Sequence, residues 1–363
     1  MPILFSDVTV VPMDGAPQVL EHAYVAVEGT KIASVGTEPP EGTFDRVVDG
    51  AGKVLLPGFV NAHTHLPMTL MRGYGGGCDL HTWLNQYIFP AEARLDSRAV
   101  AAGAGLGLAE MIASGVTCVA DMYMHTGTIA EQILEAGISA NLSCGGVYFG
   151  APEDFSPETC GDCRNQAALT EEWHGAGAGQ ILVDASVHGE YTSNPPLWRW
   201  MAEYAAEHRL GMHVHVSETQ SEHQASLERW GKTPIQALDG CGVWDCGRSL
   251  AAHCVYTTEE DWALMAEKGI SCVHNPWSNL KLGSGVAPIP AMMRAGVNVA
   301  LGTDGMSSHN SADLFSDIKL AAVLHNGVER DPMAVNAWAA LEMATVNGAR
   351  ALHAGSGVIA PGK

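Results

Sequence analysis

From Phe59 onward, short apolar runs alternate with stretches of helical periodicity, and this alternation most constrains the fold. The runs that we interpret as buried strands are FVNAHTH, TCVADMY, ISANLSCGG, ILVDASVHGEY, MHVHVSE, SLAAHC, ISCVHNP and VNVALGTD. Segments such as AVAAGAGLGLAEMIASG and EEDWALMAEKG lie between them and end in a glycine, as helices often do. Eight strands that are each followed by a helix are typical of a closed (β/α)8 TIM barrel, an α/β fold.

A doubly wound open sheet is the alternative fold for such an alternation, and the positions of the polar residues separate the two. Nearly every apolar run ends in His, Asp or Glu. The active sites of barrels are built from the C-terminal ends of many strands, whereas an open sheet gathers such residues at one switch point. The pattern therefore favours the barrel.

Residues 1–57 have a different pattern, with short alternating runs such as AYVAVEG, KIASVG and KVLLPG separated by turn residues. Runs of this kind predict a small β-domain. We therefore place one domain boundary at residue 57 and assign residues 58–355 to the barrel.

Charge and cysteine usage limit the partners and the compartment. The formal net charge of −21 argues against nucleic acid or an anionic membrane as a partner, because both require a basic face. The chain has no apolar stretch long enough to span a membrane and no basic region of a signal peptide at its start, which predicts a cytoplasmic protein. Nine cysteines, mostly inside apolar runs, indicate reduced thiols rather than a disulfide framework. A homo-oligomer is compatible with these features.

Histidines at strand ends predict a metal site. His63 and His65 alternate at the end of the first barrel run, so their side chains point to the same side. Such a pair suits zinc or a similar divalent metal, although two inward histidines can also be ordinary core residues. The fifth run offers His213 or His215 as a third imidazole, and the eighth ends in Asp304. Spacing alone allows either histidine.

Glu218 is the candidate general acid–base, because a carboxylate beside a metal can take a proton from an activated water and pass it to the substrate. Only His215 leaves this glutamate three residues further on, where the strand gives way to the loop over the metal. A glutamate that simply begins a surface helix is the alternative interpretation. His253, which ends the run LAAH, could contact the attacked group or be a core histidine.

The pair Cys160 and Cys163 forms a CxxC motif, and His188 with Glu190 forms an HxE motif. Together they are similar to the signature of another class of zinc deaminases. In that class, however, the CxxC follows the HxE and a proline precedes it, and neither holds here. A loop with two free thiols is the better interpretation.

These motifs extend over the whole chain, which resembles the amidohydrolase superfamily and, within it, the 5′-methylthioadenosine/S-adenosylhomocysteine deaminase group. The motifs that carry the resemblance are PGFVNAHTHLPMTLMRG, WLNQYIFPAE, ADMYMH, HVHVSET, AAHCVY, VHNPWSNLKLGSGVAPIP and LGTDG. The resemblance implies a barrel with a small β-sandwich domain formed from both chain ends, here residues 1–57 and those after about 356. It implies the metal ligands His63, His65, His215 and Asp304.

The resemblance also implies roles for further residues. Glu218 would shuttle protons, with Asp304 assisting, and His253 would position the attacking water. Glu92 would hold the ribose hydroxyls, while His188 and Trp83 would contact the nucleoside. Members with two metals bridge them with a lysine on the fourth strand, and this sequence has no lysine between Lys53 and Lys232. The resemblance therefore implies one divalent metal per chain, with zinc as the expected ion.

Two departures from the group bear on the substrate. Cys144 stands where members that bind S-adenosylhomocysteine carry an arginine for the amino-acid carboxylate. The loop after the metal aspartate reads GTDGMSSHN rather than GTDGAASNN, which would place His309 near the pocket. We therefore expect hydrolytic deamination of adenosine, 5′-methylthioadenosine or a 5′-deoxy analogue in preference to S-adenosylhomocysteine. Deamination of guanine, 8-oxoguanine or a pterin, hydrolysis of a triazine, and a non-catalytic binding protein are the alternatives.

Overall fold

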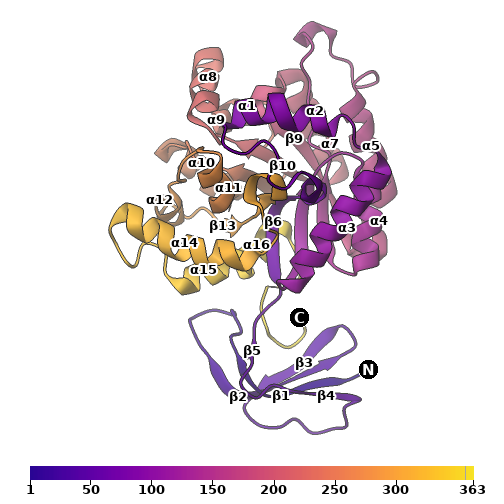
Figure 1. Cartoon of the computed structure of the whole chain (residues 1–363), viewed down its shortest axis with the longest axis vertical. Coiled ribbons are helices and arrows are strands. Elements are labelled where there is room, and N and C mark those ends of the chain that lie inside the picture. Colours follow the sequence, from indigo (N-terminus) through magenta and orange to yellow (C-terminus); the bar gives the residue numbers. More distant parts are fainter. Residues whose placement is uncertain (356) are drawn as a thin grey trace.

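The computed structural model describes residues 1–355 and 357–363, which form two sheets (Figure 1). Figure 1 shows the larger sheet inside a body of helices and the smaller sheet below that body, with both chain ends nearby. The apolar runs after Phe59 form the larger sheet, and the alternating runs before it form the smaller one.

The larger sheet is a closed ring of parallel strands. Its members are β6 (Phe59–His65), β7 (Val116–Met122), β8 (Ser139–Ser143), β9 (Ile181–Gly189), β10 (Gly211–Val216), β11 (Ser249–His253), β12 (Ile270–His274), β13 (Val299–Leu301) and β14 (Asp304–Gly305). Every residue of β6, β10, β11 and β12 is buried, as expected for parallel strands with both faces covered. The strand order is β13-β12-β11-β10-β9-β8-β7-β6-β14.

The eighth apolar run forms two short strands, β13 and β14, and together they close the ring. β13 pairs with β12, and β14, which follows after two residues of the same apolar run, pairs with β6. Asn61 spans the break between β13 and β14, because its Oδ1 accepts from the Thr303 amide at 3.0 Å and its Nδ2 donates to the Thr303 hydroxyl at 2.8 Å. A Cβ on Gly302 would lie 2.8 Å from the His63 carbonyl oxygen, so the close approach requires glycine there. The predicted barrel is confirmed.

Helices follow the strands, and the longer ones cover the outside of the ring. They are α1 (Leu80–Trp83), α2 (Phe89–Glu92), α3 (Ser97–Ala113), α4 (Thr126–Ala136), α5 (Gly161–Trp173), α6 (Ala176–Gly179), α7 (Pro195–His208), α8 (Gln220–Trp230), α9 (Pro234–Asp239), α10 (Glu259–Lys268), α11 (Pro276–Lys281), α12 (Ile289–Arg294), α13 (Met306–His309), α14 (Leu314–Glu329), α15 (Ala337–Ala344) and α16 (Val346–Leu352). Helix α10 shows why the sequence sets these bounds. Thr258 and Asp261 form a capping box at its start, and Gly269 in the left-handed conformation ends it. In the described part of the chain, the helices are too short or too polar to cross a membrane.

The small sheet is mixed and has the order β3-β2-β1-β4, with β5 also paired to β1. Its strands are β1 (Ile3–Val10), β2 (Leu20–Glu28), β3 (Lys31–Gly36), β4 (Arg46–Asp49) and β5 (Val54–Leu55). The C-terminal segment contributes to it, because Ile359 is buried in its core and donates its amide to the Pro12 carbonyl at 2.8 Å. Within residues 1–355 and 357–363 this region has one sheet, so "β-sandwich" describes it less well than "mixed sheet".

Candidate active site

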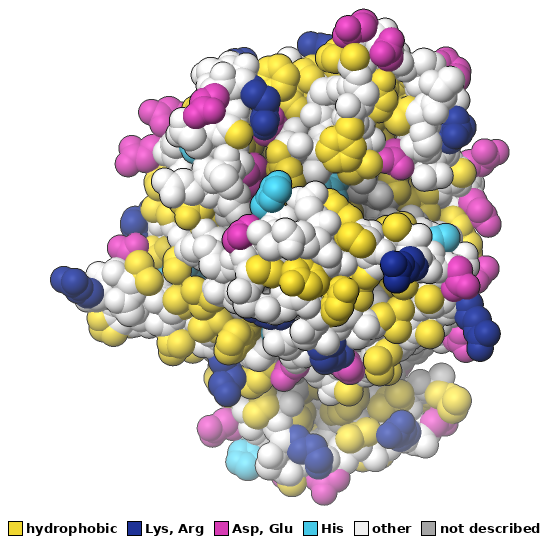
Figure 2. Space-filling model, turned by 45° about the horizontal axis from the view of Figure 1, so that its top comes forward, with side chains coloured by type: hydrophobic (Ala, Val, Ile, Leu, Met, Phe, Trp, Pro, Cys, Tyr) yellow, Lys and Arg dark blue, Asp and Glu magenta, His cyan; other side chains and the backbone are white. Residues whose placement is uncertain are grey.

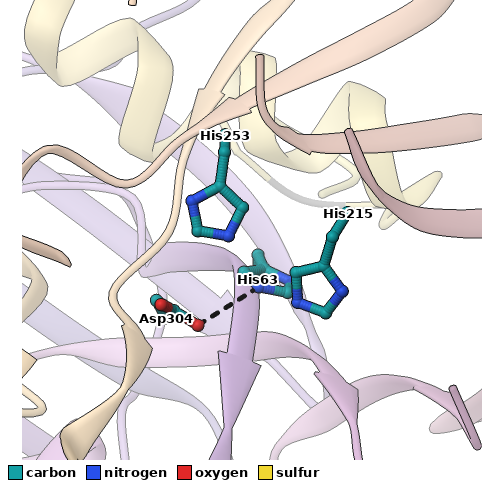
Figure 3. Close-up of side chains that lie close together, drawn as sticks. All are labelled: His63, His215, His253 and Asp304. Carbon is teal, nitrogen blue, oxygen red and sulfur yellow. Dashed lines mark ion pairs between the residues drawn. The ribbon is translucent and has the colours of Figure 1, made fainter. Parts of the chain in front are cut away.

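Four buried side chains converge at the C-terminal end of the barrel. The possible ligand atoms of His63, His215, His253 and Asp304 all lie within 4.8 Å of one another. Figure 3 shows the three imidazoles and the carboxylate pointing toward a common centre. They come from the ends of β6, β10 and β11 and from the start of β14, which is how a barrel assembles a site from residues far apart in sequence.

His65 belongs to the same group. Its Nε2 lies 3.1 Å from Asp304 Oδ1 and 3.3 Å from His215 Nε2. The fold therefore brings together all four ligands expected from the sequence, with His253 as a fifth group. Which four of the five bind an ion stays a prediction.

Backbone carbonyls orient two of the imidazoles. His65 Nδ1 lies 2.5 Å from the Met122 carbonyl, and His215 Nδ1 lies 2.6 Å from the His188 carbonyl. A carbonyl only accepts, so each Nδ1 carries the proton and each Nε2 lone pair is directed into the group. This arrangement is usual behind metal-binding histidines.

His213, the other candidate of the fifth run, lies behind the group rather than in it. Its Nε2 is 2.8 Å from His63 Nδ1, and its own Nδ1 is 3.3 Å from the Ser143 hydroxyl. His63 Nε2 is buried and lies 3.4 Å from Asp304 Oδ1, but makes no hydrogen bond among the described residues. An electron pair left without a partner at the centre of imidazoles and a carboxylate fits a divalent metal such as zinc.

Asp304 is held by two serine hydroxyls. Its Oδ2 accepts from Ser278 at 2.6 Å and from Ser308 at 2.8 Å, while Oδ1 faces the imidazoles. Burial would raise the pKa of this carboxyl, but the adjacent His63 and His65 outweigh burial and hold the pKa well below its ordinary range. Asp304 also has a φ of +60°, a sparsely populated conformation for a residue other than glycine. Such strain is often retained at functional sites.

Glu218 faces the group from the loop after β10. Its Oε2 lies 3.8 Å from His253 Nε2, and its Oε1 accepts from the Ser284 hydroxyl at 3.3 Å. Burial raises the pKa of Glu218, and His253 partly offsets that rise. The Glu222 carboxylate holds the turn, because it accepts from the amides of Ser217 at 2.8 Å and Glu218 at 2.7 Å. A fixed carboxyl with a raised pKa suits a general acid–base near neutral pH.

A cavity of about 330 Å³ opens from this group toward the surface. Its lining is mostly apolar, with carboxylates and histidines at the inner end, as in sites for small molecules. It consists of His65, Met68, Leu80, Trp83, Leu84, Phe89, Glu92, Met122, Tyr123, Met124, Cys144, Gly145, Val147, Phe149, Asp162, His188, Tyr191, Thr192, His215, Glu218, His253 and Asp304. On the face shown in Figure 2, Lys and Arg side chains are scattered singly among apolar and acidic ones.

Comparison with known proteins identifies the family, because residues 54–363 match the Amidohydrolase family. The chain belongs to the amidohydrolase family. It is 38% identical over 365 residues to the 5-methylthioadenosine/S-adenosylhomocysteine deaminase of Syntrophomonas wolfei, covering 100% of this chain and 83% of that protein. It is 42% identical over 344 residues to the 5′-deoxyadenosine deaminase of Methanothermobacter thermautotrophicus, covering 95% of this chain and 79% of that protein.

A solved structure superimposes on nearly the whole chain. The adenosine deaminase from Xanthomonas campestris, solved with bound zinc, superimposes with a TM-score of 0.92 at 35% identity. The match covers 99% of this chain and 82% of that chain.

Three of the expected substrate-binding residues, Glu92, His188 and Trp83, line this cavity. Glu92 Oε1 is buried and unpartnered in the described structure, and burial raises the pKa of this carboxyl. His188 Nδ1 lies 3.1 Å from the Thr192 hydroxyl, and burial lowers the pKa of the imidazole to about 4, so it is neutral at pH 7. The Trp83 indole donates to the Tyr74 carbonyl at 3.3 Å.

Of the other two expected substrate-binding residues, Cys144 lines the cavity and His309 does not. Cys144 lines the cavity, with its Sγ 3.4 Å from Gln166 Oε1. His309 is not among the lining residues, because α13 turns its ring toward Asp317, whose Oδ2 lies 2.8 Å from Nε2. The expectation that His309 lies near the pocket therefore differs from the observed geometry.

Sequence reasoning missed two tyrosines of the cavity. Tyr123 lines the cavity together with Glu92, and its buried hydroxyl makes no hydrogen bond among the described residues. Tyr191 follows the end of β9 and also faces the cavity. Their places in the runs ADMYMH and SVHGEY, within two residues of the ends of β7 and β9, were the available signal.

Proposed function

We propose that this amidohydrolase is a metal-dependent aminohydrolase that deaminates adenine nucleosides and releases ammonia. The observation that carries the proposal is Glu218, a buried carboxyl that faces the histidine–aspartate group at the inner end of a nucleoside-sized cavity. The names of the relatives agree with it, because those reported above act on adenosine, 5′-deoxyadenosine or 5-methylthioadenosine and S-adenosylhomocysteine.

One divalent ion, with zinc as the expected metal, would be held by His63, His65, His215 and Asp304. The orphaned Nε2 of His63 and the carbonyl-fixed Nδ1 protons of His65 and His215 support this set. The zinc in the Xanthomonas campestris structure supports the metal. When bound, the ion would supply Lewis-acid activation of water.

The residues of this chain would then move the proton. Glu218 takes the proton of the attacking water and transfers it to N1 of the adenine ring, while the new C–O bond forms at C6. His253, with its Nε2 3.8 Å from Glu218 Oε2, orients the water. The remaining proton of the attacking water, now on the C6 hydroxyl, is transferred through Glu218 to the amino nitrogen. The C6–N bond then breaks, C6=O forms, and ammonia departs. The raised pKa of Glu218 suits both halves of this transfer.

Glu92 and His188 support a ribose-bearing substrate. The buried, unpartnered oxygen of Glu92 can accept hydrogen bonds from the two vicinal ribose hydroxyls. A charged hydrogen bond of that kind contributes about 1.5–3 kcal/mol. His188, which is neutral because burial lowers its pKa to about 4, can contact the uncharged nucleoside through hydrogen bonds.

One substrate screen tests the proposal. Purified zinc-loaded protein is incubated with adenosine, 5′-deoxyadenosine, 5′-methylthioadenosine, guanine, 8-oxoguanine, pterins and triazines, and ammonia is measured. We expect ammonia from the adenine nucleosides, and release at least about 100-fold slower from the Glu218→Gln variant prepared in the same way. Ammonia only from a free base would overturn the nucleoside assignment, and no release from any compound would overturn the enzymatic one.

A further inference from the structure

Asp162, a residue inside the CxxC motif, lines the cavity. It lies between Cys160 and Cys163 in the first turn of α5. Both cysteines are buried free thiols, and neither belongs to the metal-binding group, which is the one such group in the described part of the chain. The carboxylate lines the cavity beside Cys144, away from the metal-binding end.

The loop after β8 fixes the Asp162 carboxylate without neutralising it. Oδ2 accepts from the Val147 amide at 2.8 Å, and Oδ1 accepts from Asn165 Nδ2 at 3.4 Å. Both donors are uncharged. Arg164 is near in sequence, but its guanidinium donates to the Glu158 carbonyl at 2.8 Å on the exposed side. Burial raises the pKa of Asp162, while the hydrogen bonds from Val147 and Asn165 and the first turn of α5 favour its negative charge.

The cavity continues beyond Asp162. A second hollow of about 460 Å³ shares Met124, Cys144 and Asp162 with the first, and Glu172 also lines it. Of the residues that the structure describes, those lining either hollow include no lysine and no arginine. A substituent that leaves the first cavity at this end therefore passes an unneutralised carboxylate and meets no fixed cation.

We propose that Asp162 determines specificity for the 5′ side of the nucleoside, and that it selects substituents with a primary ammonium group over those with a carboxylate. The inference rests on the proposed deamination and on its orientation, with the adenine ring at Glu218 and the ribose at Glu92. The 5′ substituent then points to the remaining end of the cavity, which Cys144 and Asp162 form. A carboxylate there attracts an ammonium group and repels a second carboxylate.

Three 5′-thioethers of adenosine with chains of equal length test the proposal. They end in an amine, a hydroxyl or a carboxylate, and kcat/KM for ammonia release is measured with zinc-loaded enzyme. We expect the amine to exceed the hydroxyl about tenfold, which corresponds to about 1.4 kcal/mol, and the carboxylate to fall below both. In Asp162→Asn, which keeps an acceptor for Val147, the three values should converge. Glu172→Gln removes a more exposed charge and should change the ratios much less.

The outcomes separate the two proposals. Equal values for the three thioethers, or a preference for the carboxylate, would overturn the role of Asp162 while leaving deamination intact. An unchanged preference in a folded Asp162→Asn, with the wild-type melting temperature, would overturn it too. No ammonia from adenosine or from any thioether would overturn the proposed function. The comparison on the wild-type enzyme decides the selectivity even if Asp162→Asn does not fold.

Discussion

The inner and outer ends of the cavity are built from different parts of the fold. At the inner end, the side chains of His63, His215 and His253 belong to buried strands whose positions the ring of hydrogen bonds sets. At the outer end, Val147, Phe149 and Asp162 belong to the loop after β8 and to the first turn of α5. The inner end is rigid because a strand cannot shift without breaking the barrel, whereas the outer end depends on a few contacts such as that between Asp162 and Val147.

The division suggests that chemistry and selectivity are separable here. Barrels place reaction chemistry at strand ends and vary their loops. In this chain the strand ends supply imidazoles and carboxylates, while the outer lining supplies apolar groups, a thiol and one acid. Substitutions at the inner end should therefore abolish turnover of every substrate, and those at the outer end should change which substrate is preferred.

The largest effect is expected from removing a predicted ligand at the inner end. His215→Ala should lose the metal and essentially all activity, whereas His213→Ala should keep a weakened site. His213 contacts His63 from behind, and loss of such a supporting contact typically costs 10- to 100-fold in metal affinity. Metal affinity from competition with a chelator, with metal content of the purified variants, measures both. Loss of metal in His213→Ala but not in His215→Ala would show that the predicted ligand is wrong.

Glu218→Gln should lower kcat by about 10²–10⁴-fold while the metal content stays at the wild-type level. The amide keeps the shape of the side chain but cannot carry the proton from water to the ring. Glu228→Gln is the matched control, because Glu228 is an exposed glutamate of the following helix α8 and does not line the cavity. If Glu218→Gln released the metal, Glu218 would be a ligand rather than a proton carrier.

The sequence predicts the inner end well and the outer end poorly, for a physical reason. A strand with period two fixes the side to which His63 and His65 point, so spacing alone indicates the cluster. No such periodicity governs loops. His309 lies only five residues after Asp304, yet the short helix α13 turns it to Asp317. The sequence does not indicate that Asp162 lines the cavity, because only the fold brings α5 against the loop after β8.

A smaller effect is expected at the middle of the cavity, from Glu92→Gln. Loss of a charged hydrogen bond to the ribose, at about 1.5–3 kcal/mol, should lower kcat/KM for adenosine by about 10- to 100-fold. Turnover of free adenine, which has no ribose, serves as the internal control and should be nearly unchanged. An equal loss for both compounds would mean that Glu92 shapes the inner end rather than recognising the sugar.

The smallest effect is expected from the CxxC cysteines at the outer end. Cys160 and Cys163 are buried free thiols, and burial raises the pKa of Cys163, which keeps it protonated and poorly reactive. The double variant Cys160→Ser/Cys163→Ser should therefore keep its metal content and change kcat for adenosine less than about twofold, because neither thiol reaches the inner end. Its melting temperature should fall slightly, since two buried hydroxyls replace two weakly polar thiols. Metal analysis, kinetics with and without a reducing agent, and thermal unfolding test these points on one preparation. Loss of the metal from this variant would place an ion at the outer end and contradict the separation of the two ends.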